Sequence, residues 1–413
     1  MTQTRAPQPA AASALPPRLL APLAVMAVVY LIYAWDRVVV PVALVEVRAA
    51  YGLTLASSSL IASVFTFGLA LTALPAGLLL ARWGTRATLV AGALLFSVCT
   101  IYVPVGRGLA DLLGARVAAG VGEGFYNVAM YSFLATLTLR YRGAAAGIAT
   151  TLFGLGMLSG PPVIAWIQRG TGNWHMPFYS LGAVGVVGAL ALLLLIDPPA
   201  ANVGRVRPPP VLPRLVRVVN RRNLIVLLAA AANGVGVYAF ISVYVTYLRG
   251  AWHMEQGSAA YIFSAYGLGG LIGGIPMGYL ADRFGRRRFL IIALLLAGIT
   301  GAAAFMLPPL VLPSLIANFC LGMLLNGSYS NCYAAIQDGV APEDIPIATG
   351  LLATVYFLTA SFSGWLLVTI ASAGGWSLAA IAVYTVPYWI CAVLFMLAGP
   401  GFNVASSGPG DVA

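Results

Sequence analysis

The sequence predicts an all-α integral membrane protein with twelve transmembrane helices in two pseudo-symmetric six-helix bundles. Of its 413 residues, 61% are hydrophobic and 8% are charged, and the mean hydropathy is +0.93, far outside the composition of soluble globular proteins. Continuous apolar runs of about 20 residues, long enough to cross a bilayer as helices, recur along the whole chain. Two similar loop sequences divide the chain into halves.

Hydropathy places six membrane spans in each half. The first half is expected at 19–196, with spans at 19–44, 54–81, 87–106, 109–138, 144–168 and 176–196. The second half is expected at 223–399, with spans at 223–248, 258–281, 289–308, 311–336, 345–371 and 377–399. A polar, Pro-rich linker at 197–222 joins them, and residues 1–18 and 400–413 form tails. The first apolar run has no small-residue cleavage site, so a removable signal peptide is not expected.

The arrangement of arginines predicts the orientation. All 22 basic residues are arginine. If the amino terminus is cytoplasmic, sixteen arginines lie on that side, four lie on the other, and Arg37 and Arg116 fall within spans. The positive-inside rule then places the linker and both termini in the cytoplasm, in a bacterial-type inner membrane. The net charge of +11 therefore indicates membrane orientation, and no nucleic-acid partner is expected.

The sequence does not favour an enzyme or a metal site. The four cysteines fall inside apolar runs without metal-ligand spacing, and both histidines fall in loops. The spans contain no Ser/His or Cys/His constellation. We therefore expect no catalytic residues, no metal and no cofactor.

The two loop sequences indicate a secondary transporter. "PAGLLLARWGTR" begins at Pro75 and "PMGYLADRFGRR" at Pro276, 201 residues later, and each joins the second and third spans of its half. Internal repeats of this kind are typical of secondary transporters. The loops resemble the signature G-x-L-A-D-R-x-G-R-R of the major facilitator superfamily, and the first copy has Ala81 where the second has Asp282. The resemblance implies a cytoplasmic gate. The expected gating residues are Asp282, Arg283, Arg286, Arg82, Arg86 and Arg116.

Two further stretches carry the resemblance. "LLGARVAAGVGEG" in the fourth span matches the family pattern L-x-x-x-R-x-x-x-G-x-G, and "GMLSGPP" lies in the fifth span. The second stretch has Gly156 and Gly160 four residues apart, followed by Pro161. Small residues at this spacing also allow close helix approach, so helix packing is an alternative explanation for that match.

Charged residues inside the spans point to a narrower resemblance. The first span contains "YLIYAWDRVVVP", which includes Asp36 and Arg37, and the fourth contains Glu123. This Asp-Arg pair and glutamate resemble the anion:cation symporter branch, which includes sialic-acid and sugar-acid proton symporters. That branch often has tyrosine two positions before the aspartate, where this chain has Ala34 and the neighbouring tyrosine is Tyr33.

The chemistry of these charges predicts their roles. A charge at membrane depth costs about 2.5–3.5 kcal/mol on insertion scales, so it needs a partner or a wet cavity. Arginine offers a planar fork that matches a carboxylate, so Arg37 is expected to bind the anionic group of the substrate. Asp36 and Glu123 are expected to carry protons, and Asp36 and Arg37 to neutralise each other in part. The alternative is a buried ion cluster that only positions helices.

Neutral polar residues complete the expected binding site. Helical spacing places several of them on faces that can line a central cavity, although aromatic or helix packing is an alternative for some. The further expected substrate-binding residues are Tyr33, Tyr126, Asn127, Tyr238, Asn326, Tyr329, Ser330 and Tyr333.

The predicted function is proton-coupled symport of a small organic anion, a mono- or dicarboxylate or a sugar acid, by alternating access. The transporter is expected to work as a monomer in the lipid bilayer. A drug/proton antiporter is an alternative, favoured by "GMLSGPP" and the aromatic spans. An organophosphate antiporter would be expected to have a second cavity arginine in the seventh span. It is disfavoured because residues 223–248 contain no arginine. A transporter-like sensor or an intramembrane enzyme is a minor alternative.

Overall fold

The chain is an all-α, multi-pass membrane protein. The computed structural model describes residues 19–73, 75–137, 142–196, 211–341 and 344–398, and these contain helices and no strand. Eight segments of this described part are long and apolar enough to cross a membrane. When helices that continue one another across a kink are joined, they form the twelve spans of two six-helix bundles, as predicted.

The described residues of the N-terminal bundle form nine helical elements. They are α1 (Leu20–Val42), α2 (Leu44–Ala50), α3 (Leu55–Ser63), α4 (Phe65–Ala73), α5 (Ala76–Tyr102), η2 (Val103–Val105), α6 (Leu109–Leu137), α7 (Arg142–Thr171) and α8 (Met176–Leu195). The N-cap of α3 is Thr54, whose hydroxyl accepts from the backbone N–H of Ser57 at 3.1 Å.

The C-terminal half follows the same plan. It contains α9 (Val211–Val218), α10 (Arg221–Ala251), α11 (Gln256–Phe284), α12 (Arg286–Met306), α13 (Val311–Gln337), α14 (Ile345–Ala360), α15 (Ser363–Ala380), η4 (Ile381–Thr385) and α16 (Val386–Leu397). Part of the expected linker is thus the helix α9, whose Val218 is fully buried and whose Arg217 lies 3.2 Å from Asp344.

Glycines set the turns between several spans. Gly84, Gly285 and Gly375 have φ angles of 79°, 87° and 83°, which glycine adopts without steric cost. Gly84 and Gly285 occupy the same position in the two loop signatures, and each separates the second span of its half from the third. The repeated loop sequence therefore produces the same sharp turn in both halves.

Arginines of the two signatures bind the end of the last helix in their own half. Arg86 donates to the carbonyl of Leu193 in α8, and Arg287 donates to the carbonyls of Phe395 and Met396 in α16 at 2.7 and 2.6 Å. Arg86 and Arg287 are equivalent residues of the repeat. Carbonyls at a helix C-terminus have no partner within the helix, so a cation there stabilises the helix end.

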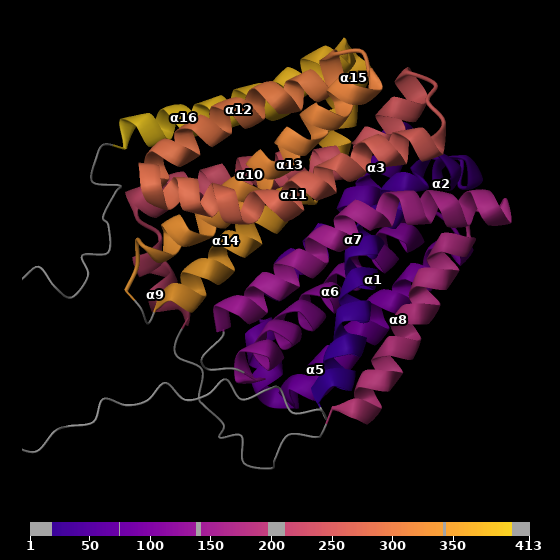
Figure 1. The fold of residues 1–413 in the computed structure, drawn as a ribbon, viewed down its shortest axis with the longest axis horizontal. Coiled ribbons are helices and arrows are strands. Elements are labelled where there is room, and N and C mark those ends of the chain that lie inside the picture. Colours follow the sequence, from indigo (N-terminus) through magenta and orange to yellow (C-terminus); the bar gives the residue numbers. More distant parts are fainter. Residues whose placement is uncertain (1–18, 74, 138–141, 197–210, 342–343, 399–413) are drawn as a thin grey trace, which may run out of the picture.

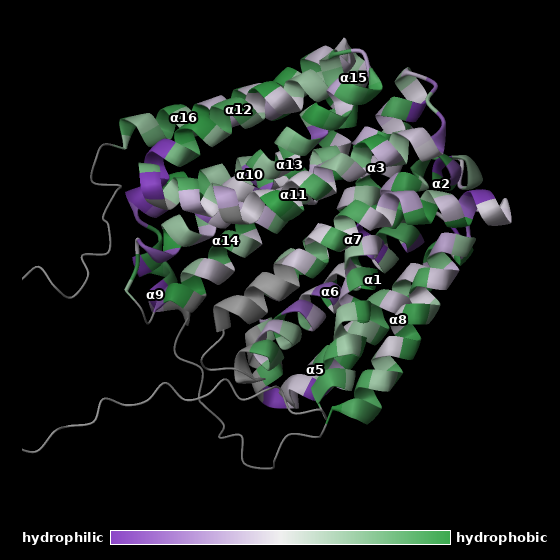
Figure 2. Cartoon of the chain, viewed as in Figure 1, coloured by the Kyte–Doolittle hydropathy of each residue, from purple (hydrophilic) through white to green (hydrophobic). Residues whose placement is uncertain are grey.

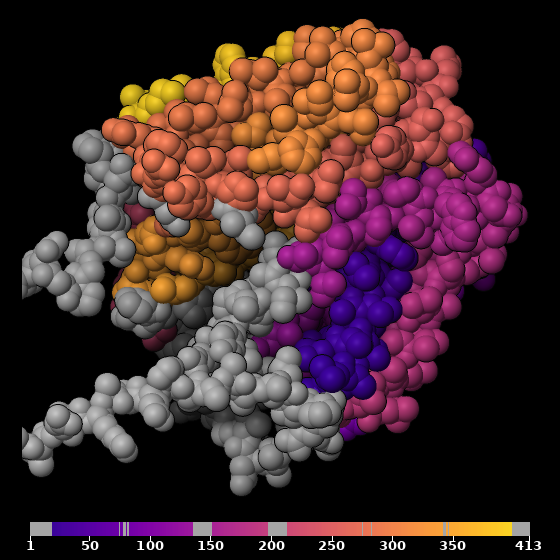
Figure 3. All heavy atoms as spheres, in the orientation of Figure 1, coloured from indigo at the N-terminus to yellow at the C-terminus, as the bar shows by residue number. Residues whose placement is uncertain are grey.

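The two bundles lie side by side and meet mainly at one end (Figure 1). We call this the α2 end, and the opposite end, which carries α9, the linker end. Figure 2 shows hydrophilic residues gathered at the two ends and apolar helices between them. Figure 3 shows the N-terminal bundle, in indigo to magenta, in contact with the salmon and orange part of the C-terminal half near the α2 end.

Ion pairs and hydrogen bonds join the halves at the α2 end. Arg249 of α10 binds Glu46 of α2 through two bonds of 2.9 and 2.6 Å. Arg169 at the end of α7 pairs with Glu255, which precedes α11. The side chain of Gln256 donates to the carbonyl of Val42 at 3.2 Å. These contacts close the α2 end of the interface between the bundles.

Candidate functional site

Helix α1 contains two adjacent buried residues of opposite charge, and each has its own partner. Asp36 is 1% exposed and Arg37 is 5% exposed. Consecutive helical residues point about 100° apart, so the two side chains do not face each other. The ion pairs of the described structure do not join Asp36 to Arg37: each pairs with a residue of α6.

Arg37 makes three hydrogen bonds with its guanidinium group. Nε donates to Oε2 of Glu123 at 2.9 Å, and one terminal nitrogen donates to the hydroxyl of Tyr238 at 2.8 Å. The other terminal nitrogen donates to the hydroxyl of Tyr33, one helical turn earlier in α1. The guanidinium carbon also lies 5.2 Å from the ring centroid of Phe153. Arg37 is thus held by both halves of the molecule.

Asp36 is paired with Arg116 of α6. The guanidinium donates to Oδ2 of Asp36 at 2.8 Å, and the hydroxyl of Thr100 in α5 donates to Oδ1. Arg116 is fully buried and its guanidinium carbon lies 4.8 Å from the ring centroid of Phe65. Arg116, expected as a gating residue, therefore lies in the buried core of the N-terminal bundle.

Asp36, Arg37, Arg116 and Glu123 form a compact cluster of two acids and two arginines, which we call the charge cluster. Arg116 and Glu123 are seven residues apart, two helical turns, and face α1 from the same side of α6. The charges of Arg37, Asp36 and Arg116 all act on the Glu123 carboxylate. Its Oε1 is buried and accepts no hydrogen bond from a described residue. With all four groups ionised the cluster is neutral, which offsets part of the cost of burial.

Glycines allow the helices around the charge cluster to approach closely. A Cβ at Gly120 of α6 would lie 1.8 Å from the carbonyl oxygen of Phe65, and one at Gly122 would lie 2.6 Å from the backbone nitrogen of Phe96. Gly120 and Gly122 thus serve helix packing, whereas a Cβ at Gly114 of the same stretch would meet no atom within 4 Å.

The close approach of α7 to α1 also explains why this chain has alanine at position 34 and its tyrosine at position 33. A Cβ at Gly156 of α7 would lie 2.4 Å from the Cβ of Ala34, which is fully buried. No space exists there for a tyrosine ring, and Tyr33, one residue earlier, supplies the hydroxyl that Arg37 binds.

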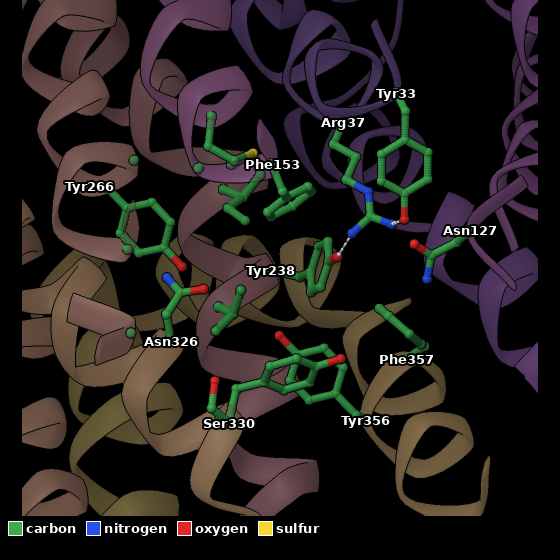
Figure 4. Close-up of a pocket in the computed structure, with 18 of the residues that line it drawn as sticks. Tyr33, Arg37, Asn127, Phe153, Tyr238, Tyr266, Asn326, Ser330, Tyr356 and Phe357 are labelled. Carbon is green, nitrogen blue, oxygen red and sulfur yellow. Dashed lines mark hydrogen bonds between the residues drawn. The ribbon is translucent and has the colours of Figure 1, made fainter. Parts of the chain in front are cut away.

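A central cavity of about 220 Å³ lies between the bundles (Figure 4). Arg37 is the only charged residue among the described residues that line it. Its volume is below the roughly 300–1,000 Å³ of pockets for drug-sized ligands, so it suits a small molecule. The lining residues are Tyr30, Tyr33, Arg37, Asn127, Tyr131, Phe153, Gly154, Met157, Val237, Tyr238, Ile241, Tyr266, Gly267, Gly270, Gly274, Asn326, Tyr329, Ser330, Tyr356 and Phe357.

Most of the expected binding residues line this cavity. They are Arg37, Tyr33, Asn127, Tyr238, Asn326, Tyr329 and Ser330. Tyr126 does not: it is fully buried and donates to the carbonyl of Met26 at 2.8 Å. Tyr333 lies behind Tyr329, with their hydroxyl oxygens 3.0 Å apart. Asp36 and Glu123 are also absent from the lining, and Glu123 reaches the cavity only through Arg37.

Several lining aromatic residues were missing from the sequence prediction. Tyr30 lies seven residues before Arg37, on the same face of α1, and this spacing was a usable signal. Tyr131 lies four residues after Asn127 on the same face of α6, which is a comparable signal. No such signal marks Phe153, Tyr266, Tyr356 and Phe357.

The remaining expected gating residues lie at the linker end. Arg286 pairs with Asp338 of the same half, and the guanidinium of Arg283 lies 3.5 Å from the hydroxyl of Tyr279. Arg82 is exposed. Asp282 belongs to α11, and its side chain lies outside the described part of the structure.

The comparisons with known proteins agree with this architecture. The sequence profile described as "Major Facilitator Superfamily" matches residues 26–247 and 226–406, nearly the whole chain. The chain belongs to the Major Facilitator Superfamily. The resemblance predicted from the loop signatures is therefore confirmed.

Individual superfamily relatives carry names of anion transporters. The chain is 31% identical over 160 residues to "Probable anion transporter 6, chloroplastic" of Arabidopsis thaliana, covering 37% of this chain and 29% of that protein. It is 30% identical over 165 residues to "Probable sulfoacetate transporter SauU" of Cupriavidus necator, covering 40% and 38%. It is 26% identical over 170 residues to the "D-galactonate transporter" of Escherichia coli, covering 41% and 39%. The chain thus spans well under half the length of these relatives.

Two further similarities extend over more of the chain. It is 22% identical over 259 residues to the "Quinolone resistance protein NorA" of Staphylococcus aureus, covering 62% of this chain and 65% of that protein. A bacterial homologue of the human lysosomal transporter Spinster, solved in an inward-facing and occupied conformation, superposes with a TM-score of 0.75 at 17% identity. That match covers 93% of this chain and 98% of the other, and supports the superfamily fold.

Proposed function

We propose that this protein is a secondary transporter that moves a small organic anion together with a proton by alternating access. The observation that carries the proposal is Arg37, the only charged residue among the described residues of the central cavity, with the Glu123 carboxylate bound behind it. A guanidinium in a small and otherwise uncharged lining attracts an anion and repels a cation. The anion-transporter names of several relatives support the same assignment.

Substrate binding would use the terminal nitrogens of Arg37. Both donate to tyrosine hydroxyls in this structure, Tyr33 and Tyr238. A substrate carboxylate can replace these neutral acceptors with two parallel bonds in a fork geometry, which add the attraction between opposite charges to the bonds that Arg37 already makes. A carboxylate in the cavity then competes with Glu123 for the positive charge of one guanidinium.

That competition couples the anion to a proton. An anion bound to Arg37 offsets the positive charge that stabilises the ionised carboxylate of Glu123. Anion binding therefore favours protonation of Glu123. Because such coupling is reciprocal, a proton on Glu123 strengthens anion binding by the same factor. Proton and anion would therefore bind and leave together.

Glu123 is better placed than Asp36 to take up the proton. Oε1 of Glu123 accepts no hydrogen bond from a described residue, whereas both carboxylate oxygens of Asp36 accept one. A proton on Asp36 would weaken its pairing with Arg116 and leave that arginine buried without a full counter-charge. We therefore assign the coupled proton mainly to Glu123. The main role of Asp36 is to pair with Arg116, and its minor role is that of a second proton site.

The contacts between the halves support an alternating-access cycle. They gather at the α2 end, through Arg249, Glu46, Arg169 and Glu255. With both termini in the cytoplasm of a bacterial-type inner membrane, the α2 end is the outer one, and this conformation faces inward. The expected inner gate at Asp282 and its neighbouring arginines would form in the outward-facing state. The transporter would work as a monomer, without a nucleic-acid partner or cofactor.

A transport assay with purified protein in lipid vesicles tests the proposal. Under an imposed pH gradient, we expect uptake of at least one anion from a panel of sulfoacetate, D-galactonate, succinate and benzoate. Dissipation of the gradient with a protonophore should abolish accumulation. Accumulation of no anion, with proton-driven movement of a lipophilic cation instead, would refute it.

That second outcome corresponds to the alternative function, a drug/proton antiporter. Two observations favour it: the aromatic lining of the cavity and the similarity to the quinolone resistance protein. Arg37 in the lining argues against cationic drugs, because a buried cation beside a guanidinium is repelled.

A further inference from the structure

The walls of the central cavity are aromatic on both sides. Of the twenty described residues that line it, nine are tyrosine or phenylalanine. Tyr30 comes from the N-terminal bundle. Figure 4 shows Phe153 of the same bundle, and Tyr266, Tyr356 and Phe357 of the C-terminal half. Aromatic rings favour stacked or edge-to-face contact with another ring, so these walls suit a flat, apolar substrate body.

The charges of the lining limit the substrate to one anionic group. Arg37 is the only charged lining residue among those described, and it lies at one side of the cavity (Figure 4). The second carboxylate of a dicarboxylate would lie among neutral groups, where a buried charge without a partner is unfavourable. The cavity therefore matches a monocarboxylate.

Several polar groups of the described lining already bond in part to other protein groups, which reduces what they can offer to the hydroxyls of a substrate. Tyr33 and Tyr238 bind Arg37, and the hydroxyl oxygen of Tyr329 lies 3.0 Å from that of Tyr333. The amide nitrogen of Asn326 donates to the carbonyl of Gly322 at 3.0 Å. A sugar acid has a hydroxyl on almost every carbon, and each hydroxyl loses hydration on entry, which is unfavourable wherever the aromatic walls supply no hydrogen-bond partner.

The side of the cavity away from Arg37 nevertheless offers a few polar groups. Asn326 and Ser330 of α13 and Tyr266 of α11 lie there (Figure 4). A substrate with its carboxylate on Arg37 could place one hydrogen-bonding group at this side. A ring that carries a hydroxyl opposite its carboxylate has this arrangement.

We infer that the substrate is an aromatic monocarboxylate, with a flat ring between the two halves, its carboxylate on Arg37 and a polar ring substituent toward Asn326 and Ser330. The inference rests on the proposed anion transport and narrows its substrate class. The preferred substrate is then neither a dicarboxylate nor a sugar acid.

Binding of five probe anions to the purified full-length protein tests this inference, read as thermal stabilisation over a concentration series. The probes are 4-hydroxybenzoate, benzoate, cyclohexanecarboxylate, D-galactonate and succinate. We expect the two aromatic acids to bind about tenfold or more tighter than D-galactonate and succinate. Cyclohexanecarboxylate has the same carbon count as benzoate without the flat ring, and we expect it to bind severalfold more weakly.

Two variants connect the preference to the cavity. Phe357→Leu keeps an apolar side chain and removes a ring, so the ratio of benzoate to cyclohexanecarboxylate affinity should fall toward one. Gly274 lines the cavity, and a Cβ there would meet no atom within 4 Å. Gly274→Val should therefore fold and should weaken the larger 2-naphthoate more than benzoate.

The outcomes separate this inference from the proposed function. If D-galactonate or succinate binds more tightly than both aromatic acids, and Arg37→Lys weakens that binding, the substrate class is wrong and anion transport stands. An unchanged affinity ratio in Phe357→Leu would also overturn the aromatic assignment. If Arg37→Lys alters the binding of no anion in the panel, the proposed function itself fails.

Discussion

Arg37 and Tyr238 occupy equivalent positions in the two halves of the chain and bind each other. They are 201 residues apart, the same separation as the two loop signatures, and their hydrogen bond measures 2.8 Å. Arg37 lies in α1 and Tyr238 in α10, the first spans of the two bundles. The repeat thus brings an arginine from one half and a tyrosine from the other together at the central cavity.

The first prediction concerns this bond between the halves. In Tyr238→Phe, one nitrogen of Arg37 loses an acceptor that a substrate carboxylate would otherwise have to displace. A hydrogen bond to a charged group contributes about 1.5–3 kcal/mol, so the affinity for a transported anion should rise by about tenfold. Isothermal titration of wild type and variant measures it. Tyr356→Phe, in the same cavity, is the matched control and should leave affinity within about twofold of wild type. Weaker binding in Tyr238→Phe would show that Tyr238 contacts the substrate itself.

The second prediction concerns the shape of the cation. Arg37→Lys keeps a positive charge but loses the planar fork and at least one of the three bonds seen here. Anion affinity should fall by at least about tenfold, or ~1.4 kcal/mol, while the protein still folds. Vesicle uptake over a substrate concentration series, with size-exclusion chromatography as the folding control, measures both. Unchanged uptake would show that Arg37 only positions helices.

The third prediction concerns the pair Asp36–Arg116, in which both side chains are at most 1% exposed. Asp36→Asn removes one partner of a buried ion pair and should destabilise the protein by about 3–5 kcal/mol. The double variant Asp36→Asn/Arg116→Gln leaves no unpaired charge, and should recover much of that loss. The midpoint of thermal unfolding in one detergent reports the effect. Additive losses in the double variant would contradict the pairing.

The fourth prediction concerns closure of the α2 end. The side chains of Arg249 and Glu46 are 17% and 21% exposed, whereas those of Arg169 and Glu255 are 65% and 59% exposed. Exposed pairs contribute about 0–1 kcal/mol, and a partly buried bidentate pair contributes more. Glu46→Gln should therefore favour the conformation in which the α2 end is open, and Glu255→Gln should have little effect.

Labelling of a buried cysteine at the interface measures this closure. Ser59 of α3 is fully buried, and its backbone lies against Gly364 of the other half. In a background without the four native cysteines, the labelling rate of Ser59→Cys should rise severalfold with Glu46→Gln and stay unchanged with Glu255→Gln. Equal rates in the parent and in Glu46→Gln would contradict the assigned latch.

The architecture was largely predictable from the sequence, because hydropathy and an internal repeat depend on local residues. The kinks within spans were less predictable. The span expected at 54–81 is divided among α3, α4 and the start of α5, and that at 345–371 between α14 and α15. Such breaks depend on local packing, for example where Ser361 accepts through its carbonyl from the hydroxyl of Ser63 in the other half.

The candidate site was predicted in its residues more than in its pairings. Intramembrane charges are conspicuous in a sequence, so Asp36, Arg37 and Glu123 were identified by their cost of burial. Their partners follow from helix rotation: Asp36 and Arg37 point about 100° apart and bind Arg116 and Glu123 instead of each other. Of the aromatic lining from the C-terminal half, Tyr238 and Tyr329 were predicted. Tyr266, Tyr356 and Phe357 were not, because their place in the lining depends on the contact between the bundles.

Proton uptake on anion binding tests the central claim most directly, which is that Glu123 takes up a proton when Arg37 binds an anion. The measurement uses purified protein in weakly buffered solution with a pH indicator, and the panel anion that stabilises the protein most. Wild-type protein should take up about one proton per bound anion. Glu123→Gln should bind the anion and take up none. Equal proton uptake by wild type and Glu123→Gln, at equal anion occupancy, would contradict the account.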